Sequence, residues 1–426
     1  MMRWLPTFSH HPMQTMGEPA AARDSMRLPP PLLAFFISAL AGTIGHAMFV
    51  YGIVVILTDA GDGALQASIV FAVAFLVMGL MTPVRGFLGD VVPIARLIRN
   101  CGFGMALAAL AFALAVPLSP APSVLFVAAL LSGALYGYAA GGVAGNRIAM
   151  VALVTSRTAT PTIILSMMTV FGFTFGPLLY AVGRVQFGDF AAMMIVAAIL
   201  LLSALSLPQP DGQHEASGGD RSGAMRGILD GVAHIFSNRS LWQALLLGIV
   251  PTLFVLGPVQ SVMPQMLASA FPGKEIFRGL VFVALGLGTL VGGIVSTRFA
   301  QSPSRQSLVI NASLLACAAI VAATSFLSQV SVLVLIFICG IGLGVPHAIV
   351  PVILQDRVDN SMRARTMAAL TLKLTGVPAI GAALCGILAS ASDARFALLV
   401  LGCCGLATGL LLARFDRPSQ SASAID

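Results

Sequence analysis

The sequence has very little charge. Only 9% of its 426 residues are Asp, Glu, Lys or Arg, against roughly 25% in an average soluble domain, and 58% are hydrophobic. A chain of this composition cannot cover a globular surface with solvated groups, so its surface must face lipid. The net charge of +7 is therefore better explained by basic loops that face anionic lipid than by nucleic-acid binding.

Acidic residues are missing from the middle of every long apolar stretch, although the chain contains 16 of them. Carboxylates inside the membrane are common proton relays in pumps. A carboxylate relay through the centre of the membrane is therefore not available to this chain. If transport is coupled to protons, the candidates are Asp59, at the outer end of the first apolar stretch, and the histidines.

Signatures of enzymes are missing too. The sequence contains no nucleotide-binding loop, no metal-ligand cluster and no nucleophile–base spacing. Its six cysteines lie in apolar stretches without a CxxC pair, and we interpret them as helix-packing residues. The sequence thus predicts no catalytic residue, no cofactor and no metal site. Residues 1–30 are polar and lead directly into the first apolar stretch, so no cleavable signal peptide is apparent.

Long apolar stretches, in contrast, are abundant. A helix needs about 20 such residues to cross the hydrocarbon core of a bilayer. We therefore predict an all-α membrane protein with twelve transmembrane helices. The predicted spans lie near residues 31–58, 65–84, 95–116, 123–145, 160–182, 189–207, 241–268, 278–297, 306–327, 331–353, 367–390 and 395–413.

Basic residues are unevenly distributed between the predicted loops. If the N-terminus is cytoplasmic, only Arg184, Lys274, Arg278 and Arg395 of the 23 Lys and Arg residues fall on the outer side. Cytoplasmic loops of membrane proteins carry an excess of Lys and Arg. The distribution predicts a multi-pass protein of the bacterial inner (cytoplasmic) membrane, with both termini in the cytoplasm.

A polar segment divides the chain into two halves. We predict a cytoplasmic N-terminal tail, a six-helix bundle, a cytoplasmic linker, a second six-helix bundle and a cytoplasmic C-terminal tail, at residues 1–30, 31–207, 208–240, 241–415 and 416–426. The segment Gly142–Arg157 aligns without gaps on Gly342–Arg357, which pairs Arg147 with His347. Two pseudo-symmetric bundles are typical of transporters that expose a midplane site alternately to each side.

Two short motifs suggest a family. The first, Gly86-Phe-Leu88-Gly-Asp90 with Arg96 and Arg99 downstream, follows the second predicted span. It resembles the glycine-x-leucine-x-aspartate loop of the major facilitator superfamily, which the chain resembles over residues 29–415. The usual Gly-Arg-Arg continuation is replaced by Val-Pro-Ile-Ala-Arg, so the basic arm is shifted. The resemblance implies a gate in which Asp90 holds a neighbouring helix through its dipole or an arginine; the alternative is a solvated loop acid.

The second motif, Gly172-x-x-x-Gly176-Pro177, resembles the front of the superfamily's antiporter motif. In the second half, Pro264–Gly293 and Leu354–Arg365 resemble the branch that contains the enterobactin exporter and macrolide efflux pumps, and siderophore-cluster permeases such as the yersiniabactin-associated one. This resemblance implies export of a siderophore or a similar amphipathic small molecule. The alternatives are import of a metal–siderophore complex and, less favoured, a membrane sensor or scaffold that transports nothing.

Polar residues inside the predicted spans are the candidates for substrate binding or coupling. An ionisable group in hydrocarbon indicates function, and Tyr and Gln at the depth of a cavity supply hydrogen bonds on an otherwise apolar wall. They are His46, Tyr51, Arg147, Gln260, His347 and Lys373. For His46 the alternative is a neutral ring hydrogen-bonded to a neighbouring helix, and for Arg147 it is a side chain that extends to the membrane interface. We expect a small-molecule substrate and a monomer in the bilayer, with protons as a candidate coupling ion.

Glycines recur every four residues along the fourth predicted span. They are Gly133, Gly137, Gly141 and Gly145. Small residues at this spacing form a smooth helix face against which another helix packs closely. We interpret this stripe as a packing surface rather than a binding site.

Overall fold

The computed structural model describes residues 30–61, 63–118, 121–154, 159–208, 237–299, 302, 304–326, 328–358 and 360–415. Within these ranges the regular secondary structure is helical. A helix satisfies its backbone donors and acceptors internally, which is what a chain surrounded by hydrocarbon requires. The predicted all-α fold is confirmed.

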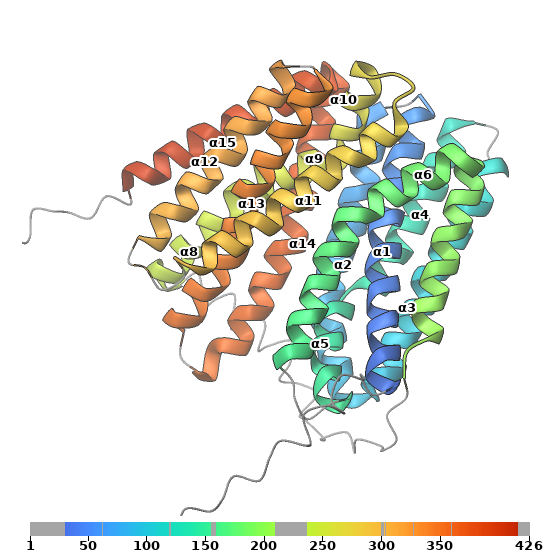
Figure 1. Ribbon diagram of the computed structural model, residues 1–426, viewed down its shortest axis with the longest axis horizontal. Helices are drawn as coiled ribbons and strands as arrows, with labels where there is room; N and C mark the ends of the chain where they lie inside the picture. Colours follow the sequence, from blue (N-terminus) through green and yellow to red (C-terminus); the bar gives the residue numbers. More distant parts are fainter. Residues whose placement is uncertain are drawn as a thin grey trace, which may run out of the picture.

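The helices form two bundles (Figure 1). The N-terminal bundle consists of α1 (Pro30–Asp59), α2 (Gly63–Val91), α3 (Ile94–Leu118), α4 (Pro122–Ala140), α5 (Val143–Val154) and α6 (Ala159–Leu205). The C-terminal bundle consists of α8 (Arg239–Pro251), the π-helix η2 (Thr252–Leu256), α9 (Gly257–Ser261), α10 (Met263–Ala270), α11 (Glu275–Thr297), α12 (Arg305–Ser325), α13 (Gln329–Arg357), α14 (Asn360–Ala391) and α15 (Ala394–Phe415).

The described residues contain 11 apolar stretches long enough to cross a membrane. One of them, Ile164–Leu205 in α6, has 42 residues, about twice the length that one crossing needs. The backbone of α6 breaks at Gly188, where φ is 82°. Only glycine adopts this left-handed conformation without strain, so the chain reverses there without a separate loop. Counted as two arms, α6 completes the twelve predicted spans.

Three helix boundaries differ from the prediction. The fourth predicted span is split into α4 and α5 at Gly142, whose φ is 77°. The seventh is interrupted by η2, which begins directly after Pro251, a residue that has no backbone N–H to donate within the helix. The motif Gly86–Asp90, expected in a loop, instead forms the last turns of α2.

Glycines bring helices into close contact at equivalent places in both bundles. A Cβ atom on Gly137 of α4, or on Gly141 directly after it, would overlap the backbone of α2, and Gly133 also faces that helix. Gly340 and Gly344 of α13 face the backbone of α11 in the same way. The predicted stripe on α4 is therefore a packing surface along most of its length, whereas a Cβ on Gly145 would meet nothing.

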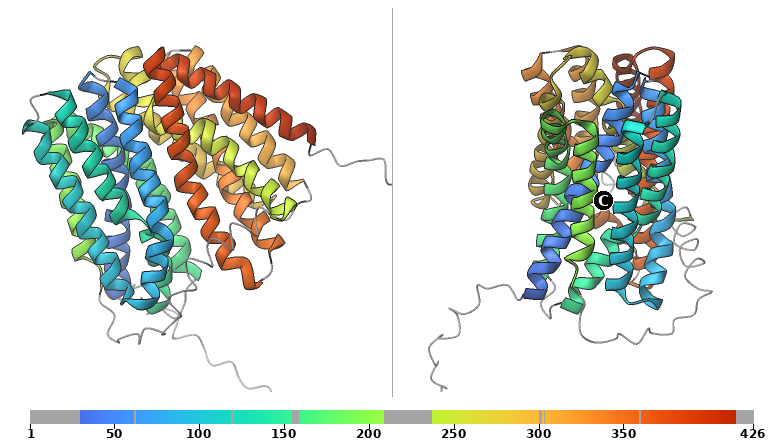
Figure 2. Two further views of the ribbon diagram at one scale, coloured as in Figure 1. Left: turned by 180° about the vertical axis from the view of Figure 1, so that it is seen from behind. Right: turned by 90° about the vertical axis from the view of Figure 1, so that its right-hand side faces the viewer.

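The two bundles contact each other mainly through α2 against α14 and α6 against α11. They converge at the end where α1 finishes and α11 starts, and they diverge at the end where α2 finishes and α14 starts (Figures 1 and 2). We call these the converging end and the diverging end.

Candidate functional site

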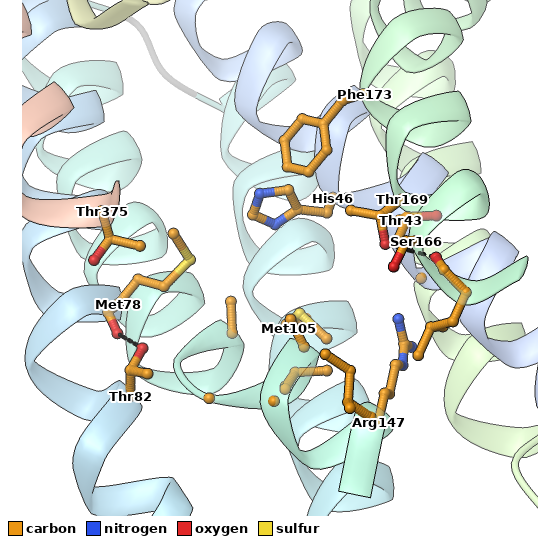
Figure 3. Close-up of a pocket in the computed structure, with 18 residues that line it drawn as sticks. Thr43, His46, Met78, Thr82, Met105, Arg147, Ser166, Thr169, Phe173 and Thr375 are labelled. Atoms are coloured by element: carbon orange, nitrogen blue, oxygen red, sulfur yellow. Dashed lines mark hydrogen bonds between the residues drawn. The ribbon is translucent and has the colours of Figure 1, made fainter. Parts of the chain in front are cut away.

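A partly open cavity of about 400 Å³ lies in the N-terminal bundle (Figure 3), a volume in the range of small-molecule sites. Its residues come from α1 to α6 and, across the boundary between the bundles, from Thr375 of α14. The α2 residues that line it, Met78 and Thr82, lie in the part of that helix nearer the diverging end. The cavity therefore occupies the half of the molecule in which the bundles separate.

His46 lies on the wall of this cavity, in the middle of α1. Its Nδ1 is 2.9 Å from the hydroxyl oxygen of Tyr136 on α4, and its ring meets Phe173 edge-on with centroids 5.2 Å apart. Tyr136 is itself stacked on Phe49 at 4.1 Å. Both interpretations of His46 are thus compatible with its position: it is hydrogen-bonded to a neighbouring helix and it faces the cavity.

Arg147 is the charged residue of the cavity wall. It extends from α5 towards α1, where Nη1 donates to the carbonyl of Ala39 at 3.3 Å. Its Nη2 donates to the carbonyl of Ser38 at 3.2 Å and to the hydroxyl of Ser203 at 3.0 Å. Only 5% of Arg147 is exposed. Its side chain is directed into the bundle rather than along the helix to the membrane interface.

Threonine hydroxyls supply most of the remaining polarity in the cavity. Thr82 donates to the carbonyl of Met78 at 2.8 Å, and Thr169 donates to that of Leu165 at 3.0 Å. Thr43 lies within hydrogen-bonding distance of the carbonyls of Ala39, Leu40 and Met168. Because these hydroxyl protons are used within the protein, the oxygens present acceptor lone pairs to a bound molecule. The rest of the wall is largely apolar.

Four of the candidate residues do not line this cavity. Tyr51 is buried against Tyr180 and Phe282, nearer the converging end. His347 is exposed on α13, and Lys373 of α14 is buried beside Gly248 of α8. Gln260 lies on the short helix α9 and is half-buried.

The gating motif is only partly visible. Gly86 is exposed on α2, Arg96 is exposed and Arg99 half-exposed on α3, and the side chain of Asp90 lies outside the described residues. Sequence reasoning missed the residue just before the motif. Arg85 is 9% exposed, its guanidinium carbon lies 4.8 Å above the ring of Tyr138, and Nη2 reaches the Tyr138 carbonyl at 3.5 Å.

The antiporter-like motif lies at the contact between α6 and α1. A Cβ on Gly172 would overlap Thr43, and one on Gly176 would overlap Ala47. The neighbouring Pro177 is buried in α6 and faces Gly279 of α11 in the other bundle. The motif thus combines close packing within one bundle with a contact between the bundles.

Five charged residues form a network at the converging end. Arg184 of α6 pairs with Asp59 of α1 at 2.5 Å, with Asp189 at 2.7 Å and with Glu275 of α11 at 3.2 Å. Arg278 of α11 pairs with Asp59 at 3.1 Å and with Glu275 at 3.0 Å. The sequence indicated outer charges here, but not that they pair across the boundary between the bundles.

Comparisons with solved structures give the same fold. A nucleoside transporter, NupG, superposes with a TM-score of 0.69 at 14% identity, covering 91% of this chain and 100% of that one. A bacterial homologue of the human lysosomal transporter Spinster, in an inward-facing, occupied conformation, gives 0.65 at 15% identity, covering 91% and 98%. A peptide transporter, POT, in complex with sulfate, gives 0.65 at 16% identity, covering 91% and 94%.

The sequence comparisons are more specific about the family. No curated protein matches this chain. The family model described as Major Facilitator Superfamily matches residues 32–375 and 279–425, which together span almost all of it. With the two-bundle architecture, this match shows that the chain belongs to the major facilitator superfamily of membrane transporters.

Proposed function

We propose that this protein is a secondary active transporter that moves an amphipathic small molecule across the bacterial inner membrane by alternating access. The observation that carries the proposal is the unequal closure of the two ends. Ion pairs join α1 and α6 to α11 at the converging end, whereas the cavity lies on the side where the bundles diverge. This arrangement fits one state of a rocking cycle.

The cycle that follows has two requirements. The two ion pairs that cross the boundary, Asp59 with Arg278 and Glu275 with Arg184, must separate before the converging end opens. A bound molecule must then bring the bundles together at the diverging end, where Thr375 of α14 already contributes to the cavity wall. With both tails in the cytoplasm, as the distribution of basic residues predicts, the cavity opens inward.

For the substrate and direction we propose export of a siderophore or a similar amphipathic metabolite. The support comes from the sequence of the second half, which resembles siderophore and macrolide exporters, and from the antiporter-like motif at the α1–α6 contact. A cavity wall of apolar and aromatic side chains with a few polar groups suits an amphipathic molecule.

The test is a comparison of small molecules in spent medium and in cells, with and without the gene, under metal limitation. Export predicts that one compound disappears from the medium, accumulates in the cells and returns to the medium when the wild-type gene is restored. Normal secretion together with poor accumulation of an added metal–siderophore complex would overturn the export direction. Unchanged metabolites and unchanged uptake would contradict the transport function.

A further inference from the structure

Arg147 holds a buried positive charge for which the described residues provide no carboxylate. Its three hydrogen bonds go to two backbone carbonyls and one hydroxyl, and its Nε–H has no hydrogen-bond partner. An isolated charge is expensive to bury unless an opposite charge or a full set of hydrogen bonds compensates it. The site is therefore incomplete as it stands.

The described carboxylates are engaged or lie elsewhere. Asp59, Asp189 and Glu275 pair with Arg184 and Arg278 at the converging end. Asp356 pairs with Arg305 within the C-terminal bundle, and Asp393 accepts a hydrogen bond from the backbone N–H of Phe396 at the start of α15. Within the part of the chain whose side chains are described, no carboxylate is left to pair with Arg147.

The neighbouring helix is shaped to receive the guanidinium. A Cβ atom on Gly42 of α1 would overlap both terminal nitrogens of Arg147 and the hydroxyl of Ser203. Glycine at this position therefore makes room for the group next to the cavity, which Gly42 and Arg147 both line. A side chain that merely extended to the membrane interface would need no such space.

We infer that the cavity binds an organic anion, and that the guanidinium of Arg147 is its anchor. This inference rests on the proposed transport function and specifies its substrate class. Arginine matches carboxylate and phosphate groups because its planar donors form paired, charge-assisted hydrogen bonds with them.

The remaining wall constrains the rest of the molecule. Phe173, Met78 and Leu165 offer apolar contact, and the Thr43 and Thr169 oxygens offer acceptors. The substrate that fits carries one anionic group, an apolar or aromatic body, and hydroxyl or N–H donors.

The experiment uses the purified full-length protein in detergent and three probes with one aromatic body: 1-naphthylacetate, 1-naphthyl phosphate and the neutral 1-naphthylacetamide. Thermal stabilisation is measured against probe concentration. We expect at least one anion to bind roughly tenfold or more tightly than the amide, since a hydrogen bond to a charged group has an effect of that size. Equal binding of the amide, or no binding of either anion, would overturn the inference.

Substitutions locate the anchor. Arg147→Gln should abolish the preference for anions, and Arg147→Lys should retain part of it. The matched control is Arg85→Gln, which removes another buried arginine of the same bundle that does not line the cavity; it should leave the preference intact. If Arg147→Gln does not fold, Gly42→Ala replaces it, because the added methyl displaces the guanidinium but keeps its charge. Anion preference that survives in the folded variant would refute the assignment.

Failure of this inference can be distinguished from failure of the transport function. If the gene-dependent metabolite proves to be neutral, and Arg147→Gln exports it at the wild-type rate, the protein is a transporter with another kind of substrate. If no metabolite depends on the gene, the proposed transport function itself fails, whatever the probes show.

Discussion

The two ends of the molecule are held together differently. At the converging end, Glu275 and Arg278 of α11 pair with Arg184 of α6 and Asp59 of α1 across the boundary between the bundles. The ion pair between Arg305 and Asp356, by contrast, joins α12 to α13 within the C-terminal bundle. Glycines reinforce the difference, because Gly279 and Gly386 let α11 and α14 approach the other bundle near the converging end. Interactions that cross the boundary hold one conformation, whereas interactions within a bundle move with it.

The largest effect is expected from removing both cations of the network. The double variant Arg184→Gln, Arg278→Gln leaves Asp59, Asp189 and Glu275 without their partners. Removing one partner of a buried ion pair typically destabilises a protein by roughly 3–5 kcal/mol. The effect is smaller here because the carboxylates are partly exposed. We expect the converging end to open and transport to fall by about tenfold or more.

The opening can be measured by electron spin resonance. Spin labels at Phe187 of α6 and Ile276 of α11, both exposed, report the distance across the converging end. The double variant should shift the distribution to longer distances in a membrane-reconstituted sample. An unchanged distribution would show that the network does not hold this end closed.

The second prediction concerns the close contact between α14 and α2, which a bulky side chain would disrupt. Gly386 of α14 lies against Ser68 and Ala64 of α2, so Gly386→Leu should force the bundles apart at the converging end. Overpacking of this kind typically costs about 1–3 kcal/mol, and we expect transport to fall several-fold. Gly293→Leu is the matched control, since a Cβ there meets no atom within 4 Å. Equal transport rates for the two variants would contradict the prediction.

The third prediction concerns His46, between the two ends. His46→Ala should reduce transport of the identified metabolite several-fold while membrane abundance stays normal. Tyr136→Phe removes only the hydrogen bond to His46 and should have a smaller effect. Comparison of export rates at equal protein levels checks both. Wild-type transport by His46→Ala would assign this histidine to packing alone.

The smallest effect is expected within one bundle. Asp356 is 52% exposed in its pair with Arg305, and exposed pairs contribute about 0–1 kcal/mol. Asp356→Asn should therefore leave transport within roughly twofold of wild type. The transport rates of Asp356→Asn and the wild type are compared in proteoliposomes. A large loss of transport would mean that this ion pair also controls the conformational cycle.

The sequence predicted the structural features that depend on the residues of a single helix. Span lengths and apolar composition predicted the twelve crossings, and the spacing of Gly133, Gly137 and Gly141 predicted a packing face. Isolated polar residues in apolar surroundings singled out His46 and Arg147, which both line the cavity; their role in binding stays a prediction. Each of these signals is local and has a direct physical cause.

Contacts between segments far apart in the sequence could not be predicted from such local signals. Asp59 and Arg278 are 219 positions apart, and nothing in their local sequence distinguishes a paired charge from a solvated one. Tyr51 and Gln260 were assigned to the cavity by depth, but depth does not say which way a helix face points. The last turns of α2 were expected in a loop because the motif Gly86–Asp90 resembles a loop of the superfamily; the helix instead continues through Gly86 and Gly89, although glycine is a weak helix former.

The fixed position of Arg147 has an energetic consequence for the direction of transport. An anion bound there crosses the bilayer with its own negative charge, because the compensating charge belongs to the protein and is not carried along. Moving one elementary charge through a membrane potential of 100 mV is worth about 2.3 kcal/mol. In a cell that is electrically negative inside, this term alone favours outward movement of a monoanion by roughly fortyfold.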